Sequence, residues 1–391
     1  MTGARSRESR VRVLMTADAV GGVWSYALEL ARALAPRGVE VHLATMGPRP
    51  DAAQRAAAAE VPALTLHESD HRLEWMDAPW DDVARAGDWL ARLARTLRPD
   101  VVHLNGYAHG ALPWRAPALV VAHSCVCSWW RAVHGEAAPP SWDRYRAAVR
   151  AGLAGAELVA APTAAMLAAL RAEHDVCGEA LVLPNGRDAR RFRPGRKEPL
   201  VLGAGRAWDA AKNLAALDAA AAELPWPVRV AGPVVHPDGG EQPFRHVDAL
   251  GPLAHDALAA ELARAAIFAL PARYEPFGLA ALEAGLAGCA LVLGDIPSLR
   301  ELWQDAAVFV PPDDVDGLRA ALVALACDPD RRSALAGAAR ARALTFTPHR
   351  MTDAYLEAYR RLPRRSRAAA SAAPIMGPPS ARPTEAIACT S

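Results

Sequence analysis

The chain has 391 residues, of which 44 are Lys or Arg and 43 are Asp or Glu, and 52% of its residues are apolar. A formal net charge of +1 argues against nucleic acid as a partner, and the length favours two domains over one. The six cysteines, at positions 125, 127, 177, 289, 327 and 389, show neither a CxxC pair nor metal-like spacing, which favours reduced thiols in a cytoplasmic protein. No segment reaches the roughly 18 uninterrupted apolar residues of a membrane helix, so we expect peripheral association with the inner membrane face at most.

The chain opens with a βαβ pattern. Strands are predicted over residues 11–15 and 39–43, and a helix over residues 24–34 lies between them. Gly21 and Gly22 fall in the turn after the first strand, where a backbone without side chains can approach a ligand. The full G-x-G-x-x-G is absent, so a dinucleotide site is poorly supported, and a plain tight turn is the alternative.

Histidines follow the next strands of the pattern. A strand is predicted over residues 101–104, and another over residues 119–122 ends at His123. Open α/β sheets bind ligands at the carboxyl ends of their strands, so His123 is a candidate catalytic residue, with a structural histidine as the alternative. The tryptophan-rich segment 125–142 is expected to be irregular. It reads as an acceptor-binding loop, because indole faces stack on sugar rings, or as a packed lid.

The pattern restarts after a polar, proline-bearing linker at residues 190–199. A strand at residues 200–202 leads into a glycine-rich loop that carries Arg206 and Lys212, and a helix is predicted over residues 214–223. Two cations at the carboxyl end of a strand can neutralise a diphosphate. Solvated surface charges are the alternative.

The segment around Glu275 and Glu283 is the most informative part of the chain. An apolar strand over residues 266–270 precedes it, and Pro276 predicts that a helix begins there. Glu283 then lies about two turns into the helix at roughly 3.6 residues per turn. The first amides of a helix point outward and suit a phosphate; they would be those of Phe277, Gly278 and Leu279. These features predict a nucleotide-sugar site, against the alternative of a helix with an acidic first turn.

The rest of the chain completes a second doubly wound unit. Helices are predicted over residues 315–326, 330–343 and 349–362, and the tail from residue 363 is expected to be disordered. Two Asp-x-Asp pairs, at residues 314–316 and 328–330, have the spacing of a metal motif. Both fall at helix starts, where capping explains them, so no metal site is predicted.

Together these residues resemble the retaining glycosyltransferases of GT-B fold, family 4, over roughly residues 12–362. The resemblance rests on the two glutamates in company, and in family order, with the following motifs: Gly21-Gly22, His123, Pro184-Asn185-Gly186, Arg206 and Lys212-Asn213. It implies an α/β fold of two facing Rossmann-like domains, at residues 1–189 and 190–348. A crossover helix at residues 349–362 then returns to the first domain, and the disordered tail covers residues 363–391.

The resemblance also implies roles. Arg206 and Lys212 would grip the donor diphosphate, and Glu275 would hold hydroxyls of the transferred sugar. Glu283 would bind the ribose. Gly21 and Gly22 would form the loop that closes on the phosphate and the acceptor. His123 would lie beside the sugar at the reaction centre. The amides of Phe277, Gly278 and Leu279 would add contacts to the sugar and the phosphate.

The expected activity is sugar transfer from a nucleotide-sugar, UDP- or GDP-linked, with retention of configuration and without cofactor or metal. The acceptor, a glycan, a lipid-linked sugar or a small molecule, stays open. We expect the product to be a bacterial surface or exported glycan, or a small glycoconjugate. Two alternatives use the same fold: a non-hydrolysing sugar-nucleotide 2-epimerase, and a non-catalytic nucleotide-sugar binder.

Overall fold

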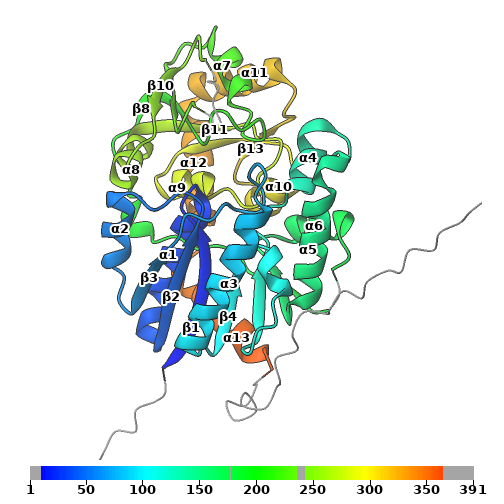
Figure 1. Ribbon diagram of the computed structural model, residues 1–391. Coiled ribbons are helices and arrows are strands. Elements are labelled where there is room, and N and C mark those ends of the chain that lie inside the picture. The colour runs from blue at the N-terminus through cyan, green and yellow to red at the C-terminus, as the bar shows by residue number, and fades with distance from the viewer. Residues whose placement is uncertain (1–9, 177, 236–242, 364–391) are drawn as a thin grey trace, which may run out of the picture.

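The structure is a computed structural model that describes residues 10–176, 178–235 and 243–363 (Figure 1). It contains two α/β domains, each built on a parallel sheet, and the predicted GT-B fold class is confirmed. Central strands of both sheets are short and wholly apolar, as in β5 (Ala118–Val121) and β11 (Ala265–Leu270), whose residues are all buried. Such strands suit a parallel sheet, because helices cover both of its faces.

The first domain carries a seven-stranded sheet in the order β3-β2-β1-β4-β5-β6-β7. Besides β5, its strands are β1 (Val11–Asp18), β2 (Val39–Met46), β3 (Leu64–Glu68), β4 (Val101–Leu104), β6 (Leu158–Ala161) and β7 (Ala180–Val182). Its helices are α1 (Gly22–Leu34), α2 (Ala52–Ala59), α3 (Trp80–Leu97), α4 (Val126–His134), α5 (Asp143–Gly155) and α6 (Ala164–Glu173). Sequence reasoning did not identify β3, α2 or α6.

The second domain carries a six-stranded sheet in the order β10-β9-β8-β11-β12-β13. Its strands are β8 (Glu198–Ala204), β9 (Val228–Ala231), β10 (Asp248–Gly251), β11 (Ala265–Leu270), β12 (Ala290–Gly294) and β13 (Val308–Val310). Its helices are α7 (Leu214–Ala221), α8 (His255–Arg264), α9 (Leu279–Leu286), α10 (Pro297–Trp303), α11 (Val315–Cys327) and α12 (Pro329–Ala343).

The last helix, α13 (Pro348–Arg361), returns to the first domain. Thr347 caps it by accepting a hydrogen bond from the Arg350 amide, and Pro348 occupies its first turn. Its apolar face, including Met351 and Tyr355, joins the core beneath α1. The hydroxyl of Tyr359 lies 2.8 Å from Nδ1 of the buried His103. The crossover helix of the predicted fold class is therefore present.

Both sheets place a topological switch point beside their first strand. β1 lies between β2 and β4, and β8 lies between β9 and β11, so the chain reverses direction across each sheet at these positions. Crevices for ligands form at the carboxyl ends of strands at such points. The loops after β1, β4, β8 and β11 are therefore the places to look for a site.

The start of α9 differs from the sequence prediction. The helix begins at Leu279 rather than at Pro276, because Gly278 adopts a left-handed conformation with φ of 85° and stands as the N-cap. The carboxylate of Glu275 folds back over this turn and accepts a hydrogen bond of 2.9 Å from the Gly278 amide. The amide of Gly278 is thus already bonded, and the prediction that it is free for phosphate is wrong in this conformation.

The tryptophan-rich segment is also more regular than predicted. Residues 126–134 form α4, and residues 140–142 form a short 3-10 helix, so the expectation of an irregular loop is wrong. The helical spacing of its apolar residues buries Cys127 and packs Val126 and Trp130 against the core.

The predicted tail, beyond Pro363, lies outside the described residues. Within the described part of the chain, no helix is both long enough and apolar enough to cross a membrane.

Candidate functional site

A cavity of about 1570 Å³ lies between the two domains, where the two switch points meet. Every predicted catalytic and donor-binding residue lines it. They are Gly21, Gly22 and His123 from the first domain, and Arg206, Lys212, Glu275, Phe277, Gly278, Leu279 and Glu283 from the second. The structure thus brings together in one place residues that are spread over much of the sequence.

The loop after β1 closes the cavity from the first domain. Gly21 is the N-cap of α1, and a Cβ atom added to it would lie 3.2 Å from Nη1 of Arg206 in the other domain. Glycine at this position therefore lets the two domains approach closely. Just before this loop, Asp18 accepts a hydrogen bond of 3.0 Å from the Val20 amide. Burial raises the pKa of the Asp18 carboxyl, while that hydrogen bond opposes the shift.

His123 stands in the cavity at the carboxyl end of β5 with a fixed orientation. Its Nε2 lies 2.8 Å from Oδ1 of Asn105. The Asn105 amide nitrogen donates to the carbonyl of Thr16 at 2.7 Å, so its oxygen must face the histidine. A carbonyl oxygen only accepts, hence Nε2 carries the proton and Nδ1 keeps its lone pair. Burial lowers the pKa of His123 to about 3, so the ring is neutral at pH 7.

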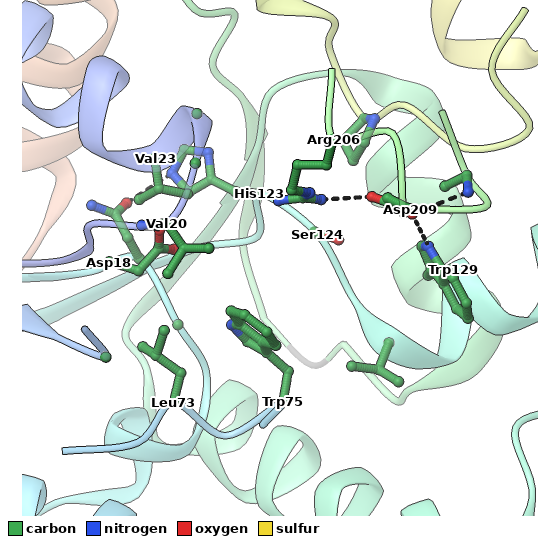
Figure 2. A pocket seen from close by; sticks show the side chains of 18 of the residues that line it. Asp18, Val20, Val23, Leu73, Trp75, His123, Ser124, Trp129, Arg206 and Asp209 are labelled. Carbon is green, nitrogen blue, oxygen red and sulfur yellow. Dashed lines mark hydrogen bonds and ion pairs between the residues drawn. The ribbon is translucent and has the colours of Figure 1, made fainter. Parts of the chain in front are cut away.

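Arg206 is paired with a carboxylate that sequence reasoning missed. Asp209, three residues later, accepts a hydrogen bond of 2.7 Å from Nη2 of Arg206. It also accepts one of 3.0 Å from the indole of Trp129 on α4, across the domain boundary (Figure 2). The Nε of Arg206 is buried and has no hydrogen-bond partner among the described residues. A buried donor without a partner is costly, so an acceptor atom from a ligand would stabilise it.

Lys212 and Glu275 form an ion pair at the floor of the cavity. The ammonium lies 2.6 Å from Oε2 of Glu275, and their side chains are 17% and 13% exposed. The hydroxyl of Ser298 donates to the Glu275 carbonyl at 2.5 Å, which holds the loop in place. An ammonium has three N–H donors, so Lys212 can keep this pair and still bind a phosphate oxygen.

Glu283 is held by a buried arginine from the segment that joins the domains. Nε of Arg187 donates to Glu283 at 2.8 Å, and Nη1 contacts Glu29 of α1 at 3.3 Å. Its Nη2 lies 3.2 Å from Nε2 of His255, which must accept, since a guanidinium only donates. Burial raises the pKa of Glu29, although Arg187 opposes the shift.

Sequence reasoning missed Asp18, Asn105, Asp209, Arg187 and Glu29. The first two follow strands of the predicted sheet, so the rule that selected His123 could have found them. Arg187 follows a turn that the sequence analysis singled out. Glu29 interrupts the apolar run of a predicted helix, which is a signal for a buried charge with a partner.

The first-domain wall of the cavity is rich in aromatic and apolar side chains. Leu73 and Trp75 face the hollow in Figure 2, below His123 and opposite Arg206. Trp129, Trp130 and Trp142 of the tryptophan-rich segment also line it. The cavity thus has a charged wall in the second domain and an aromatic wall in the first.

Comparison with known proteins gives matches in both halves of the chain. Residues 20–191 match the family described as Glycosyltransferase Family 4, and residues 242–342 match Glycosyl transferases group 1. A glycogen synthase of Mycobacterium tuberculosis is 44% identical over 95 residues, which span 24% of this chain and 23% of that protein. A D-inositol 3-phosphate glycosyltransferase of Xylanimonas cellulosilytica is 28% identical over 90% of this chain and 94% of its own.

Solved structures share the fold. Sucrose-phosphate synthase from Thermosynechococcus elongatus superposes with a TM-score of 0.74 at 20% identity, over 90% of this chain and 98% of that one. Anabaena HepE in complex with UDP-glucose gives a TM-score of 0.71 at 18% identity, over 90% and 100%. At these identities the likeness concerns the arrangement of the two domains.

Proposed function

The chain belongs to the family 4 glycosyltransferases of GT-B fold, and from this premise we propose that it moves a sugar from a UDP- or GDP-linked donor to an acceptor hydroxyl with retention of anomeric configuration. One observation carries the proposal: two cations and two carboxylates, spread over residues 206–283, meet in one interdomain cavity at the switch point of the second sheet. The full-length likeness to an inositol phosphate glycosyltransferase supports it.

The donor lies, in this proposal, along the charged wall. Arg206 and Lys212 bind the diphosphate, and the amides of Phe277 and Leu279 add contacts at the start of α9. Glu275 holds hydroxyls of the sugar, and Glu283 holds the ribose. The unpartnered Nε of Arg206 supports a bound anion there.

The transfer step needs little beyond positioning and charge. The acceptor oxygen forms a bond to the anomeric carbon as the bond to the phosphate oxygen breaks, and the hydroxyl proton passes to that departing oxygen. Negative charge builds on the diphosphate, where Arg206 and Lys212 stabilise it; removing one such donor typically costs about 10²–10³ in rate. Same-face attack explains retention without a dedicated nucleophile.

The role of His123 is to accept a hydrogen bond from a sugar hydroxyl at Nδ1, because the neutral ring carries its proton on Nε2. Neither a cofactor nor a free metal takes part in this proposal.

The acceptor binds, we propose, against the aromatic wall. Trp75 and Trp129 offer flat apolar faces on which a sugar ring can stack. This favours a glycan, free or lipid-linked, over a small charged metabolite. We also propose that the protein acts in the cytoplasm. If its acceptor is lipid-linked, it acts at the inner face of the membrane.

The aromatic wall also separates this proposal from its alternatives. A sugar-nucleotide 2-epimerase needs no acceptor, and a non-catalytic binder has no use for an oriented His123. Incubating the protein with a donor and no acceptor identifies an epimerase, because only an epimerase then converts the sugar; a non-catalytic binder is identified by donor binding without turnover under any acceptor.

The test is a thermal-shift screen of the purified protein against UDP, GDP, ADP and their common sugar conjugates, without added metal. A ligand that binds only the native state raises the melting temperature by mass action. We expect a shift with one nucleotide series that is lost in Lys212→Ala. The control is Arg264→Ala, which removes an exposed cation of the same domain, outside the cavity. No shift with any nucleotide in folded protein, or an unchanged shift in Lys212→Ala, would refute the proposed donor site.

A further inference from the structure

Two cysteines and a histidine meet behind the aromatic wall of the cavity. The Sγ of Cys125 lies 3.2 Å from Nε2 of His174, and one ligand atom from each of Cys125, Cys127 and His174 lies within 4.8 Å of the other two. Their side chains are completely buried, with exposures of 1%, 0% and 2%. The sequence analysis did not identify this group, because His174 lies 49 residues from Cys125.

Two packed helices hold the three residues in place. Cys125 is the N-cap of α4 and Cys127 lies in its first turn, while His174 is the C-cap of α6, with its amide bonded to the Leu170 carbonyl. An ion pair between Arg131 of α4 and Glu173 of α6 joins the same two helices. The group is therefore built by secondary structure, and no loop has to move to bring it together.

The other buried cysteine that the structure describes shows what an ordinary buried thiol looks like. Cys289 donates to the backbone carbonyls of Leu262 and Ala265 at 3.2 and 3.3 Å, and its Sγ also lies 3.6 Å from the Lys197 ammonium. Cys125 instead faces an imidazole, with a second thiol beside it. The contact of His174 with Cys125 uses Nε2, the ring nitrogen that would bind a metal, and the buried Nδ1 is left without a hydrogen-bond partner among the described residues.

We propose that Cys125, Cys127 and His174 bind one zinc ion. Zinc prefers tetrahedral sites of thiolate sulfur and imidazole nitrogen at about 2.3 and 2.0–2.1 Å, which places ligand atoms roughly 3.3–3.8 Å apart. The observed separations allow this arrangement with small side-chain adjustments. Two thiolates neutralise the charge of the ion, so the complex is neutral, as complete burial requires. Among the residues that the structure describes, no fourth Cys, His, Asp or Glu joins the group.

The site acts on the cavity through the chain. Cys125 follows His123 and Ser124 directly, and α4 carries Trp129, which bonds to Asp209 of the other domain. Zinc would fix the start of α4 and thereby the aromatic wall. It is a structural metal behind the reaction centre, and it takes no part in the transfer step. This inference does not rest on the proposed sugar transfer.

The test is metal analysis of the intact protein, purified with reductant and zinc and then dialysed. We expect about one zinc per chain by mass spectrometry of the metal. Replacement of zinc by Co²⁺ should add the near-ultraviolet absorption of thiolate–cobalt bonds. Cys127→Ser and His174→Gln should lower the zinc content at least tenfold. Cys289→Ser, a buried thiol in the other domain, and Cys327→Ser, an exposed one, should leave it unchanged.

Three results would overturn the proposal. They are a folded, reduced wild type without zinc, a cobalt spectrum without thiolate bands, and equal zinc in Cys127→Ser and wild type. If the variants fail to fold, the cobalt spectrum of the wild type still decides. None of these readouts depends on glycosyl transfer, so the site and the proposed function can fail separately.

Discussion

The two glutamates of one motif, Glu275 and Glu283, line the same cavity but are held in different ways. Glu275 lies on a loop, shares one ion pair with Lys212 and keeps part of its side chain in contact with the cavity. Glu283 lies in α9, and its partner Arg187 has a side chain only 3% exposed. Arg187 also reaches Glu29 in the first domain. The first carboxylate is available for exchange with a ligand, whereas the second belongs to a junction between the domains.

The difference has an energetic basis. Lys212 and Glu275 both line the cavity, so donors and acceptors of a bound ligand can replace the contacts that the pair gives up when it reorganises. A buried charge that loses its partner is strongly destabilising. We call Arg187, Glu29, Glu283 and His255 the buried junction. It ties three segments of the chain together: α1 of the first domain, the connection between the domains, and the wall of the second domain formed by α8 and α9.

The largest expected effect comes from breaking the buried junction. Arg187→Ala leaves Glu29 and Glu283 as buried carboxylates without a counter-charge, and we expect the unfolding free energy to fall by about 3–5 kcal/mol. Urea unfolding followed by circular dichroism measures the change. Arg187→Lys, which keeps the charge but loses the planar fork, should show a smaller loss.

The matched control for this variant is Arg264→Ala. Arg264 forms an ion pair with Glu198 at 2.9 Å, but both side chains are more than 40% exposed. We expect its loss to lower stability far less than the loss of Arg187, because exposed ion pairs contribute little. Equal losses in Arg187→Ala and Arg264→Ala would show that burial does not distinguish the two regions.

The next effect concerns the exchangeable carboxylate. Glu275→Gln keeps an acceptor for the Gly278 amide but removes the charge that faces Lys212 and the proposed sugar hydroxyls. We expect kcat/KM to fall by about 10²–10³, near 2.7–4 kcal/mol, while the melting temperature changes little. Steady-state kinetics with the donor found by thermal shift gives the ratio.

Glu283→Gln sharpens the comparison, because the same substitution there should act on stability as well as on nucleotide affinity. It weakens a buried pair with Arg187. If Glu275→Gln destabilises the fold as much as Glu283→Gln does, the two glutamates do not have separate tasks.

The fold could be predicted from the sequence because its signals are local. Apolar runs such as residues 119–122 and 266–270 are short, uninterrupted and separated by helical periodicity, which favours parallel strands. The start of α9 could not be predicted so well. Pro276 fits a first helical turn, but the backbone of Gly278 and the folded-back Glu275 delay the helix by three residues, and both depend on contacts made in the folded state.

The candidate site was predicted where a residue follows a strand or a glycine-rich turn, as His123, Arg206 and Lys212 do. Its partners were not, because pairing depends on which segments meet in space. Asp209 lies in a loop without a motif that would mark it. Arg187 and Glu29 are 158 residues apart in the sequence, and Cys125 and His174 are 49 apart, so no local pattern links either pair.

The smallest expected effect is on the pH dependence of folding stability. His123 at the reaction centre and Glu29 of the buried junction should contribute to it with opposite signs. Burial lowers the pKa of His123 to about 3 from an unfolded value of 6.5. Below pH 6.5 the imidazole is therefore protonated in the unfolded state but stays neutral in the folded state. Stability is therefore lost as pH falls from 6.5, by up to about 1.4 kcal/mol for each pH unit. Glu29 acts in the opposite direction, because its raised pKa makes the folded state bind the extra proton above pH 4.5, and stability then falls as pH rises.

Urea midpoints between pH 5 and 7.5 test both signs. His103, with a pKa also lowered to about 3 by burial, adds to the slope of the wild type and remains in every variant. His123→Gln removes one titrating group from the unfolded state, so its stability should depend less on pH than that of the wild type. Glu29→Gln removes the opposing contribution and should make the dependence steeper. If both variants change the slope in the same direction, the protonation state assigned to one of the two regions is wrong. The proposed transfer step requires a neutral His123. The titration of its ring, followed by NMR, would then test that assignment directly.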